Sequence, residues 1–462
     1  MPVVSLVSGY LFARLLSFLT YQEPFANQII ALLAIIIFVY FCLKNPKLGW
    51  FMLIGELLLD GAGHFFEFQG LLLRTWFLGV FGTIWLIERI RRKKFRLSLP
   101  PRSLGICAIV LAGVVILAIV NGFVSGHAPT NILQDAVLFF FILLFFPAVE
   151  FRESAREIFT PIISAWIIGT AIFSLLTFLI YSGGFGYLPD TYYHWFRNMA
   201  AGKITDLGNN FFRVVLPEQL FILPIILVIA ARLINDIRSK KLWALLAISS
   251  VILILNFSRI YFLALIVGMA VLAIRSPVCR WFTVSATTAG LMMVIFILFS
   301  LLASRGNSFG LELLGLRASG ISAPMADTSG AIRLAMLPDI SHSIETAPWF
   351  GSGLGATVRY LDPVTKNRVT RTQFDWGYFE MLAELGVVGT IIFLCFIFII
   401  SYYLFQLAYR QTGGDFALAR GLLAGASALL IANITTPALF HGFGILYIGM
   451  LMIFVTEKNV KC

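Results

Sequence analysis

The segment LWALLAISSVILILNFSRIYFLALIVGMAVLAI, residues 242–274, contains two almost entirely apolar runs that meet at Phe257, Ser258 and Arg259. Solidly apolar runs, as opposed to alternating ones, are typical of membrane-crossing helices and not of membrane β-strands. Similar runs recur along the 462 residues, of which 59% are hydrophobic and 12% charged. Soluble proteins carry about 25% charged residues. The sequence therefore predicts an all-α polytopic membrane protein.

The apolar runs predict one integral membrane domain over residues 1–462, with about 14 transmembrane helices and a range of about 12–14. The first run is short and contains Arg14, so an interfacial or re-entrant helix is its alternative. The expected spans are residues 3–20, 26–43, 49–67, 71–89, 104–124, 133–149, 159–181, 216–234, 242–256, 259–274, 281–303, 376–408, 419–436 and 440–456.

Positive residues gather in alternate loops. Seven lie between Arg89 and Arg102, whereas the short loops at 21–24, 67–70 and 124–130 contain none. The positive-inside rule then predicts cytoplasmic N- and C-termini, and it accounts for the net charge of +11 without nucleic acid as a partner.

With this orientation, two long segments lie outside: a shorter loop, 182–218, and a large loop, 303–375. Loops of this length usually carry function or are disordered. The large loop interleaves apolar runs at 311–316 and 331–337 with proline and glycine punctuation. We expect it to be partly helical and to cap the bundle.

The tip formed by Ser258 and Arg259 joins two apolar runs of 15 residues. A helix of that length is about 22 Å long, which is less than the bilayer core. The tip is therefore expected to lie in a recess below the outer surface, where a guanidinium group needs an anion. A snorkelling arginine at the interface is the alternative.

Arg333 is followed by the run PWFGSGLG, residues 348–355. A guanidinium group binds phosphate oxygens through two N–H groups. Gly351, Gly353 and Gly355 permit backbone turns whose N–H groups form an anion-binding nest, although a flexible re-entry loop is equally compatible. Arg213 lies just before an entering helix, and its alternative interpretation is a surface arginine.

The segment TQFDWGYFEMLAELGVVG, residues 372–389, opens a long predicted span. Asp375 falls at the helix N-terminus, where an N-cap is the structural alternative to a functional carboxylate. Glu384 lies nine residues further, about 13 Å deeper and on the opposite helix face. We expect it to pair with a buried polar group of another helix.

Glu56, Asp60 and His64 follow one another at four-residue spacing on the third span. Such a stripe indicates either a proton path or interhelical hydrogen bonds. No local pair of histidines, cysteine cluster or carboxylate triplet suggests a metal, and no Walker or nucleophile-elbow motif is present. The sequence thus predicts neither a metal nor another cofactor.

In their order and spacing, these motifs resemble the O-antigen ligase and polymerase superfamily of bacterial envelope glycan enzymes. The resemblance rests on four features. Ser258-Arg259 opens an apolar helix, Arg333 precedes the glycine-rich run, and the large loop contains both Arg333 and that run. The fourth feature is the motif E-x-G-x-x-G at Glu384–Gly389. These matches span about residues 213–389.

The resemblance implies a glycosyltransferase of the bacterial inner membrane whose active site faces the periplasm and whose donor is an undecaprenyl-diphosphate-linked glycan. Arg259 and Arg333, helped by Arg213, are expected to stabilise the departing diphosphate, and Asp375 is expected to act as base or to orient the acceptor. The remaining expected substrate-binding residues are Ser258, Gly351, Gly353, Gly355, Tyr378 and Glu384.

Ligases of this superfamily typically carry His followed by Asn or Ser where this chain has Asp375-Trp376. The difference favours an O-antigen polymerase of lipopolysaccharide biosynthesis, which transfers the glycan to a sugar hydroxyl of a lipid-linked acceptor repeat and has a chain-length regulator as partner. One alternative is an O-antigen ligase acting on lipid A core. The other is a transporter or flippase of a lipid-linked glycan, for which the arginines and the Glu56–His64 stripe serve binding and coupling.

Overall fold

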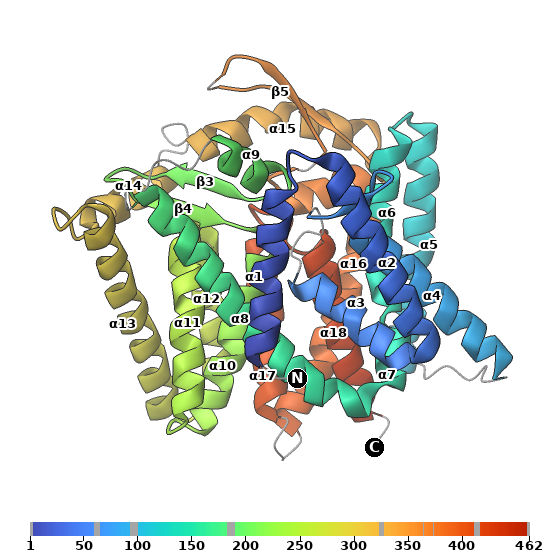
Figure 1. The fold of residues 1–462 in the computed structure, drawn as a ribbon, viewed down its shortest axis with the longest axis horizontal. Helices are drawn as coiled ribbons and strands as arrows, with labels where there is room; N and C mark the ends of the chain where they lie inside the picture. The colour runs from blue at the N-terminus through green and yellow to red at the C-terminus, as the bar shows by residue number, and fades with distance from the viewer. Residues whose placement is uncertain are drawn as a thin grey trace.

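The computed structural model describes residues 3–59, 65–92, 100–182, 190–322, 328–363, 365–372, 374–410 and 416–459. Long helices run side by side and form the body of the molecule, and a layer of short elements covers one end (Figure 1). We call this layer the cap. It consists of α9 (Asp190–Asn198), the hairpin β3 (Lys203–Asp206) and β4 (Phe212–Val215), α14 (Leu311–Ser322), α15 (Thr328–Thr346), and the hairpin β5 (Val358–Leu361) and β6 (Arg368–Arg371).

Every predicted span overlaps a helix of the body, although the span 49–67 runs beyond the end of α3 at Leu59 and the span 133–149 covers both α6 and α7. Among the described residues, seven segments are long and apolar enough to cross a membrane and four further apolar helices are shorter, so the chain is an all-α polytopic membrane protein. The body elements are α1 (Val3–Leu19), α2 (Pro24–Lys44), α3 (Pro46–Leu59), the small hairpin β1 (Glu67–Phe68) and β2 (Leu71–Leu72), α4 (Leu73–Arg91), α5 (Arg102–Val124), α6 (Pro129–Leu143), α7 (Phe145–Glu150), α8 (Arg152–Ser182), the 3-10 helix η1 (Pro217–Phe221), α10 (Ile222–Asn235), α11 (Lys240–Asn256), α12 (Arg259–Ala273), α13 (Val278–Ala303), α16 (Gly377–Arg410), α17 (Phe416–Ala432) and α18 (Gly442–Asn459).

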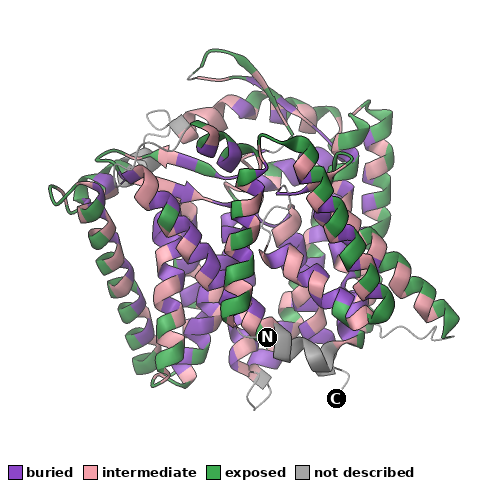
Figure 2. Cartoon of the chain, in the orientation of Figure 1, coloured by how far each residue is buried: buried purple, intermediate pink, exposed green. Residues whose placement is uncertain are grey.

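Burial decreases from the centre of the bundle outward (Figure 2). Within an 18-residue stretch of Pro217–Asn235, 78% of the residues are buried, whereas the corresponding share in Arg102–Val124 is 22%. Ile109, Ile116 and Phe123 on α5 are exposed apolar side chains. Such a continuous apolar exterior fits contact with lipid and not with water.

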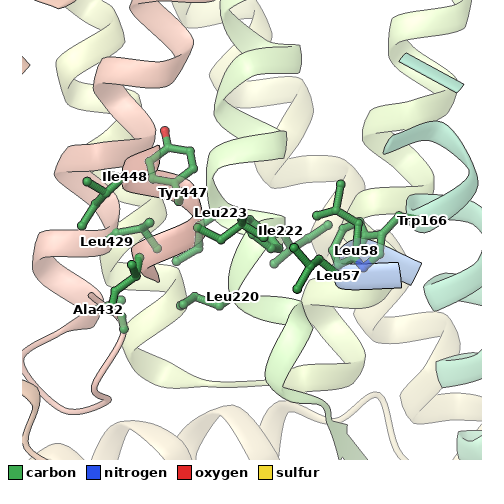
Figure 3. Packing of buried hydrophobic residues seen from close by; sticks show 14 of the residues in the cluster. Leu57, Leu58, Trp166, Leu220, Ile222, Leu223, Leu429, Ala432, Tyr447 and Ile448 are labelled. Carbon is green, nitrogen blue, oxygen red and sulfur yellow. The ribbon is translucent and has the colours of Figure 1, made fainter. Parts of the chain in front are cut away.

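The centre of the core is built on η1 and α10, whose side chains contact several helices at once (Figure 3). Leu220, Ile222 and Leu223 are all buried there. The surrounding residues labelled in Figure 3 are Leu57 and Leu58 of α3, Trp166 of α8, Leu429 and Ala432 of α17, and Tyr447 and Ile448 of α18.

The predicted short helices around Arg259 are present as α11 and α12. Phe257 ends α11 in the left-handed conformation with φ 47°, and its amide donates to the Leu253 carbonyl at 3.0 Å. Its ring stacks on Phe296 of α13, with centroids 5.1 Å apart. This packing holds the turn between α11 and α12 against a third helix.

Helix α1 is 17 residues long, which places it among the shorter apolar helices, and it is packed into the bundle. It packs along α8, and its Arg14 is only 1% exposed. Arg14 Nη2 lies 2.9 Å from Glu218 Oε1, and Nη1 donates to the Leu59 carbonyl at 2.8 Å. The guanidinium group also lies 3.5 Å from the ring centroid of Tyr10. The positive charge of Arg14, which made the first apolar run an uncertain membrane helix, is therefore compensated by Glu218 of η1.

We predict that Arg14→Met lowers the stability of the folded protein by about 3–5 kcal/mol, because it leaves the Glu218 carboxylate buried without its partner. The double variant Arg14→Met/Glu218→Leu removes both charges and should recover most of the loss. Thermal unfolding in detergent measures both effects. A double variant less stable than Arg14→Met would contradict the pairing.

Aromatic packing attaches the cap to the bundle. Trp195 of α9 is buried, and its ring contacts those of Phe18, Phe65 and Phe173. Its Nε1 donates to Ser17 Oγ of α1 at 3.1 Å. The apolar runs of the large loop form part of α14 and α15, so this loop is partly helical as predicted.

Candidate active site

Helix α16 is broken at Gly386, where the backbone has φ 68° and ψ −177°. A break inside an apolar bundle leaves amides and carbonyls that need new partners. Residues 348–356, which we call the glycine loop, provide them in both directions. The four bonds are Val387 N to Pro348 O (2.9 Å), Val388 N to Trp349 O (3.1 Å), Ser352 N to Ala383 O (2.8 Å) and Gly353 N to Glu384 O (3.1 Å).

Glycine is required where the loop crosses the helices. Gly351 has φ 71°, and a Cβ atom there would lie 2.3 Å from the Glu384 carbonyl oxygen. At Gly353 a Cβ atom would lie 2.0 Å from the backbone nitrogen of Gly122 in α5. The loop backbone thus packs directly against α5 and α16, at distances that a side chain would prevent.

The anion-binding nest expected from Gly351, Gly353 and Gly355 is replaced by this packing. The amide of Gly351 donates to Ala347 O at 3.0 Å, and that of Gly353 donates to α16. The amide of Gly355 donates to Asp135 Oδ2 at 2.9 Å. Because all three N–H groups are engaged within the protein, the loop is a structural joint, and its glycines do not offer donors to a substrate.

Two carboxylates hold the end of the glycine loop. Asp135 of α6 binds Gly355, and Glu384 Oε1 accepts a hydrogen bond from the Ala356 amide at 3.1 Å. Glu384 is 1% exposed. It pairs with a buried polar group, as expected, but that group is loop backbone and does not belong to another helix.

His441, the residue before α18, approaches the first turn of α16. Its Nε2 lies 3.2 Å from Glu380 Oε1, and the Phe374 amide donates to the same carboxylate. This pair fastens the start of α18 to the first turn of α16.

The structure brings Arg333 and Asp375 together. Arg333 Nε lies 4.0 Å from Asp375 Oδ2, and the two side chains are 27% and 38% exposed. The Trp376 indole donates to the Arg333 carbonyl at 3.0 Å. Helix α15 is positioned by Met336 and Ile340, which pack in a small core with residues of β5 and α16. An arginine and a carboxylate, both partly exposed, thus stand next to each other.

Arg213 belongs to the same region. It lies on β4 next to β3, and its charge acts on Lys203 together with that of Asp375. Desolvation lowers the pKa of Lys203, the charges of Arg213 and Arg197 lower it further, and Asp375 opposes them. The hairpin register places Lys203 and Arg213 on one face.

Ser258 and Arg259 lie at the start of α12, beneath the β3–β4 hairpin. The Phe257 ring packs on Phe211, with centroids 5.7 Å apart, and Phe211 precedes Arg213 by two residues. The tip and the hairpin are therefore in contact. Arg259 is half-buried.

Tyr378 has a structural role in this conformation. Its hydroxyl donates to the Leu430 carbonyl of α17 at 2.7 Å, which fastens the first turn of α16. It is half-buried and its hydroxyl points to protein backbone, in contrast to the expected substrate contact.

Neither the stripe of Glu56, Asp60 and His64 nor a metal site can be connected to the residues described above. Asp60 and His64 lie outside the described residues, so the stripe stays a prediction. In the described part of the chain, no group of three or more His, Cys, Asp and Glu residues is arranged to hold a metal ion. A small apolar pocket between α3, α6, α7, α8 and α18, lined by Trp50 and Phe141 among others, contains none of the residues considered above.

Residues 244–394 match the family model described as O-antigen ligase. The match agrees with the resemblance of the sequence motifs to the O-antigen ligase and polymerase superfamily. The matched residues run from α11 to the middle of α16 and include Arg259, Arg333, the glycine loop, Asp375 and the break at Gly386. Members of this superfamily are glycosyltransferase-like enzymes. No curated protein matches the chain.

Three residues of this site were not identified from the sequence: Asp135, Glu380 and His441. Asp135 and His441 lie outside the matched region, on helices far apart in the sequence. Glu380 lies between Asp375 and Glu384 in the same segment. It is four residues before Glu384, so both side chains lie on one face of a helix, and this spacing could have identified Glu380 from the sequence.

We predict that Gly351→Ala lowers the stability of the protein by at least about 2 kcal/mol, because alanine is strained at φ 71° and its Cβ overlaps α16. Gly126→Ala is the matched control, since Gly126 has φ 76° but a Cβ atom at this position would meet no heavy atom within 4 Å. The thermal midpoints in detergent should separate the two variants. Equal midpoints would refute the packed joint.

The contact between His441 and Glu380 predicts a cost for removing one partner. We expect His441→Leu to lower the stability of the protein by about 3–5 kcal/mol, because it leaves the buried Glu380 carboxyl group without its partner. Thermal unfolding in detergent measures the loss. An unchanged thermal midpoint would contradict the pairing.

Proposed function

We propose that this protein is an O-antigen-type polysaccharide polymerase, which transfers a glycan from undecaprenyl diphosphate to a sugar hydroxyl of a lipid-linked acceptor repeat. The observation that carries the proposal is the pair formed by Arg333 and Asp375, 4.0 Å apart and both partly exposed. An anion-binding group and a proton acceptor are what this transfer needs at one place.

The proposed reaction uses the carboxylate and the guanidinium groups at the same time. The acceptor hydroxyl gives its proton to Asp375 as its oxygen bonds to the anomeric carbon of the donor. The bond from that carbon to the diphosphate oxygen breaks, and the electron pair leaves with undecaprenyl diphosphate. Arg333 and Arg259, with Arg213, stabilise the charge that develops on the leaving group.

The distribution of charge supports a periplasmic site in the inner membrane. The end opposite the cap carries Lys44 and Lys47 between α2 and α3, and Lys240 and Lys241 at the start of α11. Helix α1 begins and α18 ends at the same end (Figure 1). Positive short loops are typical of the cytoplasmic side. The termini are then cytoplasmic, and the cap with Arg333 and Asp375 faces the periplasm.

An O-antigen ligase is the second candidate, because the matching family model carries that description. In that case the acceptor is a hydroxyl of lipid A core. Asp375-Trp376 favours the polymerase, since ligases typically have His followed by Asn or Ser there. The donor and the chemistry are the same for both candidates.

We predict that Asp375→Asn and Arg333→Ala each slow glycan transfer by about 100-fold or more, because one removes the base and the other a charge on the leaving group. Purified protein is incubated with lipid-diphosphate repeat units, and products are separated as a chain-length ladder. Arg368→Ala, an exposed arginine at the start of β6, is the control and should keep the wild-type ladder.

An unchanged ladder for both site variants, at normal protein levels, would defeat the assignment. Transfer to lipid A core without lengthening would instead identify a ligase. Movement of lipid-linked glycan across liposomes without any new glycosidic bond would support the transporter.

A further inference from the structure

Gln219 of η1 is fully buried, and its side-chain amide bonds to three other segments of the protein. Its Oε1 accepts one hydrogen bond from the Leu216 amide at 3.1 Å and another from Asn256 Nδ2. Its Nε2 donates to Ser174 Oγ of α8 at 3.2 Å. A primary amide has two acceptor positions and two donor hydrogens, so three of its four bonds are made here.

Two of the bonded segments contain arginines that we expect to stabilise the leaving group. Leu216 directly follows β4 and lies three residues after Arg213. Asn256 ends α11 and lies three residues before Arg259. The amide of Gln219 is therefore a direct link between the strand with Arg213 and the turn with Arg259.

An aromatic contact joins the same two segments at a second point. Phe211, two residues before Arg213, packs on Phe257, two residues before Arg259, with ring centroids 5.7 Å apart. Aromatic pairs tolerate a range of offsets, whereas a hydrogen bond weakens steeply away from its preferred geometry. The ring contact keeps the two segments together, and the buried amide determines how one is placed along the other.

We propose that Gln219 is a positioning residue that fixes Arg213 and Arg259 relative to each other, so that both act on the diphosphate of the lipid-linked donor. The proposal rests on the proposed function, because it takes these arginines as the groups that stabilise the departing diphosphate. Cations held in place beforehand stabilise developing charge without reorganisation at the moment of reaction. Gln219 acts through the arginines, since its own amide bonds to protein groups.

Binding of inorganic pyrophosphate to the purified full-length protein tests the proposal, because this probe carries the diphosphate without lipid or sugar. Gln219→Met removes the amide and keeps an unbranched side chain. We expect it to weaken pyrophosphate binding by about fivefold or more. Asn256→Leu removes only the bond from α11 and should weaken binding in the same direction, so it decides the question if Gln219→Met does not fold.

Thr170→Val is the matched control. Thr170 is buried on α8, and its hydroxyl shares a hydrogen bond of 2.9 Å with the Tyr10 hydroxyl of α1. This bond joins α1 to α8 and involves neither segment with an arginine. Thermal midpoints in detergent should fall in both variants, but Thr170→Val should change pyrophosphate binding by less than about twofold. An equal loss of binding in Thr170→Val and Gln219→Met would overturn the proposal.

Glycan transfer separates positioning from a smaller amount of folded protein. Gln219→Met should slow transfer by about tenfold or more when both arginines are present. In the background Arg213→Ala/Arg259→Ala, the same change should slow transfer by less than about a further twofold, because the groups through which Gln219 acts are gone. Equal slowing in both backgrounds would assign Gln219 to stability alone.

Failure of this proposal differs from failure of the proposed function. If Arg259→Ala weakens pyrophosphate binding while Gln219→Met and Asn256→Leu do not, the arginines keep their role and the positioning role of Gln219 is wrong. If Arg259→Ala leaves both pyrophosphate binding and glycan transfer unchanged, the leaving-group assignment itself is wrong.

Discussion

The structure depends on the repair of a broken helix. Where α16 opens at Gly386, backbone groups inside an apolar bundle would each cost several kcal/mol without partners. The glycine loop pairs with them, and α5 and α6 enclose the loop from the other side. Because the loop connects α15 to β5, fixing it also fixes the elements next to it. The positions of Arg333 and Asp375 follow from this joint, although neither residue takes part in it.

Charge is treated differently in the bundle and in the cap. Inside the bundle, Arg14 has Glu218, and His441 has Glu380 with Asp135 nearby. An uncompensated charge would be expensive at these depths. In the cap, Arg333 and Asp375 are both partly exposed, 4.0 Å apart. Water screens charges at such positions, so a charged group there costs much less than one inside the bundle.

The two glycine-containing motifs that carry the family resemblance pack against each other. The P-x-x-G-x-G-x-G run and the E-x-G-x-x-G run are separated by about thirty residues, and their backbones hydrogen-bond to each other. The sequence indicated the need for glycine at these positions but not its cause. Alternate glycines suit an anion nest and a close backbone crossing equally well, and the partner that distinguishes the two lies on other elements.

The sequence by itself determined the helical class, the approximate positions of the long apolar helices, and the choice of Arg333 and Asp375 as candidate residues, although not their pairing. Those features follow from runs of apolar residues and from local residue chemistry, which need no knowledge of neighbours. Tertiary structure alone decided that Arg14 meets Glu218, that Asp135 and His441 join the carboxylates of α16, and that the glycine loop is packed instead of open. Each of these joins segments far apart in the chain, and in a membrane bundle the contacts between helices are set by packing and by the pairing of buried polar groups, not by spacing along one helix.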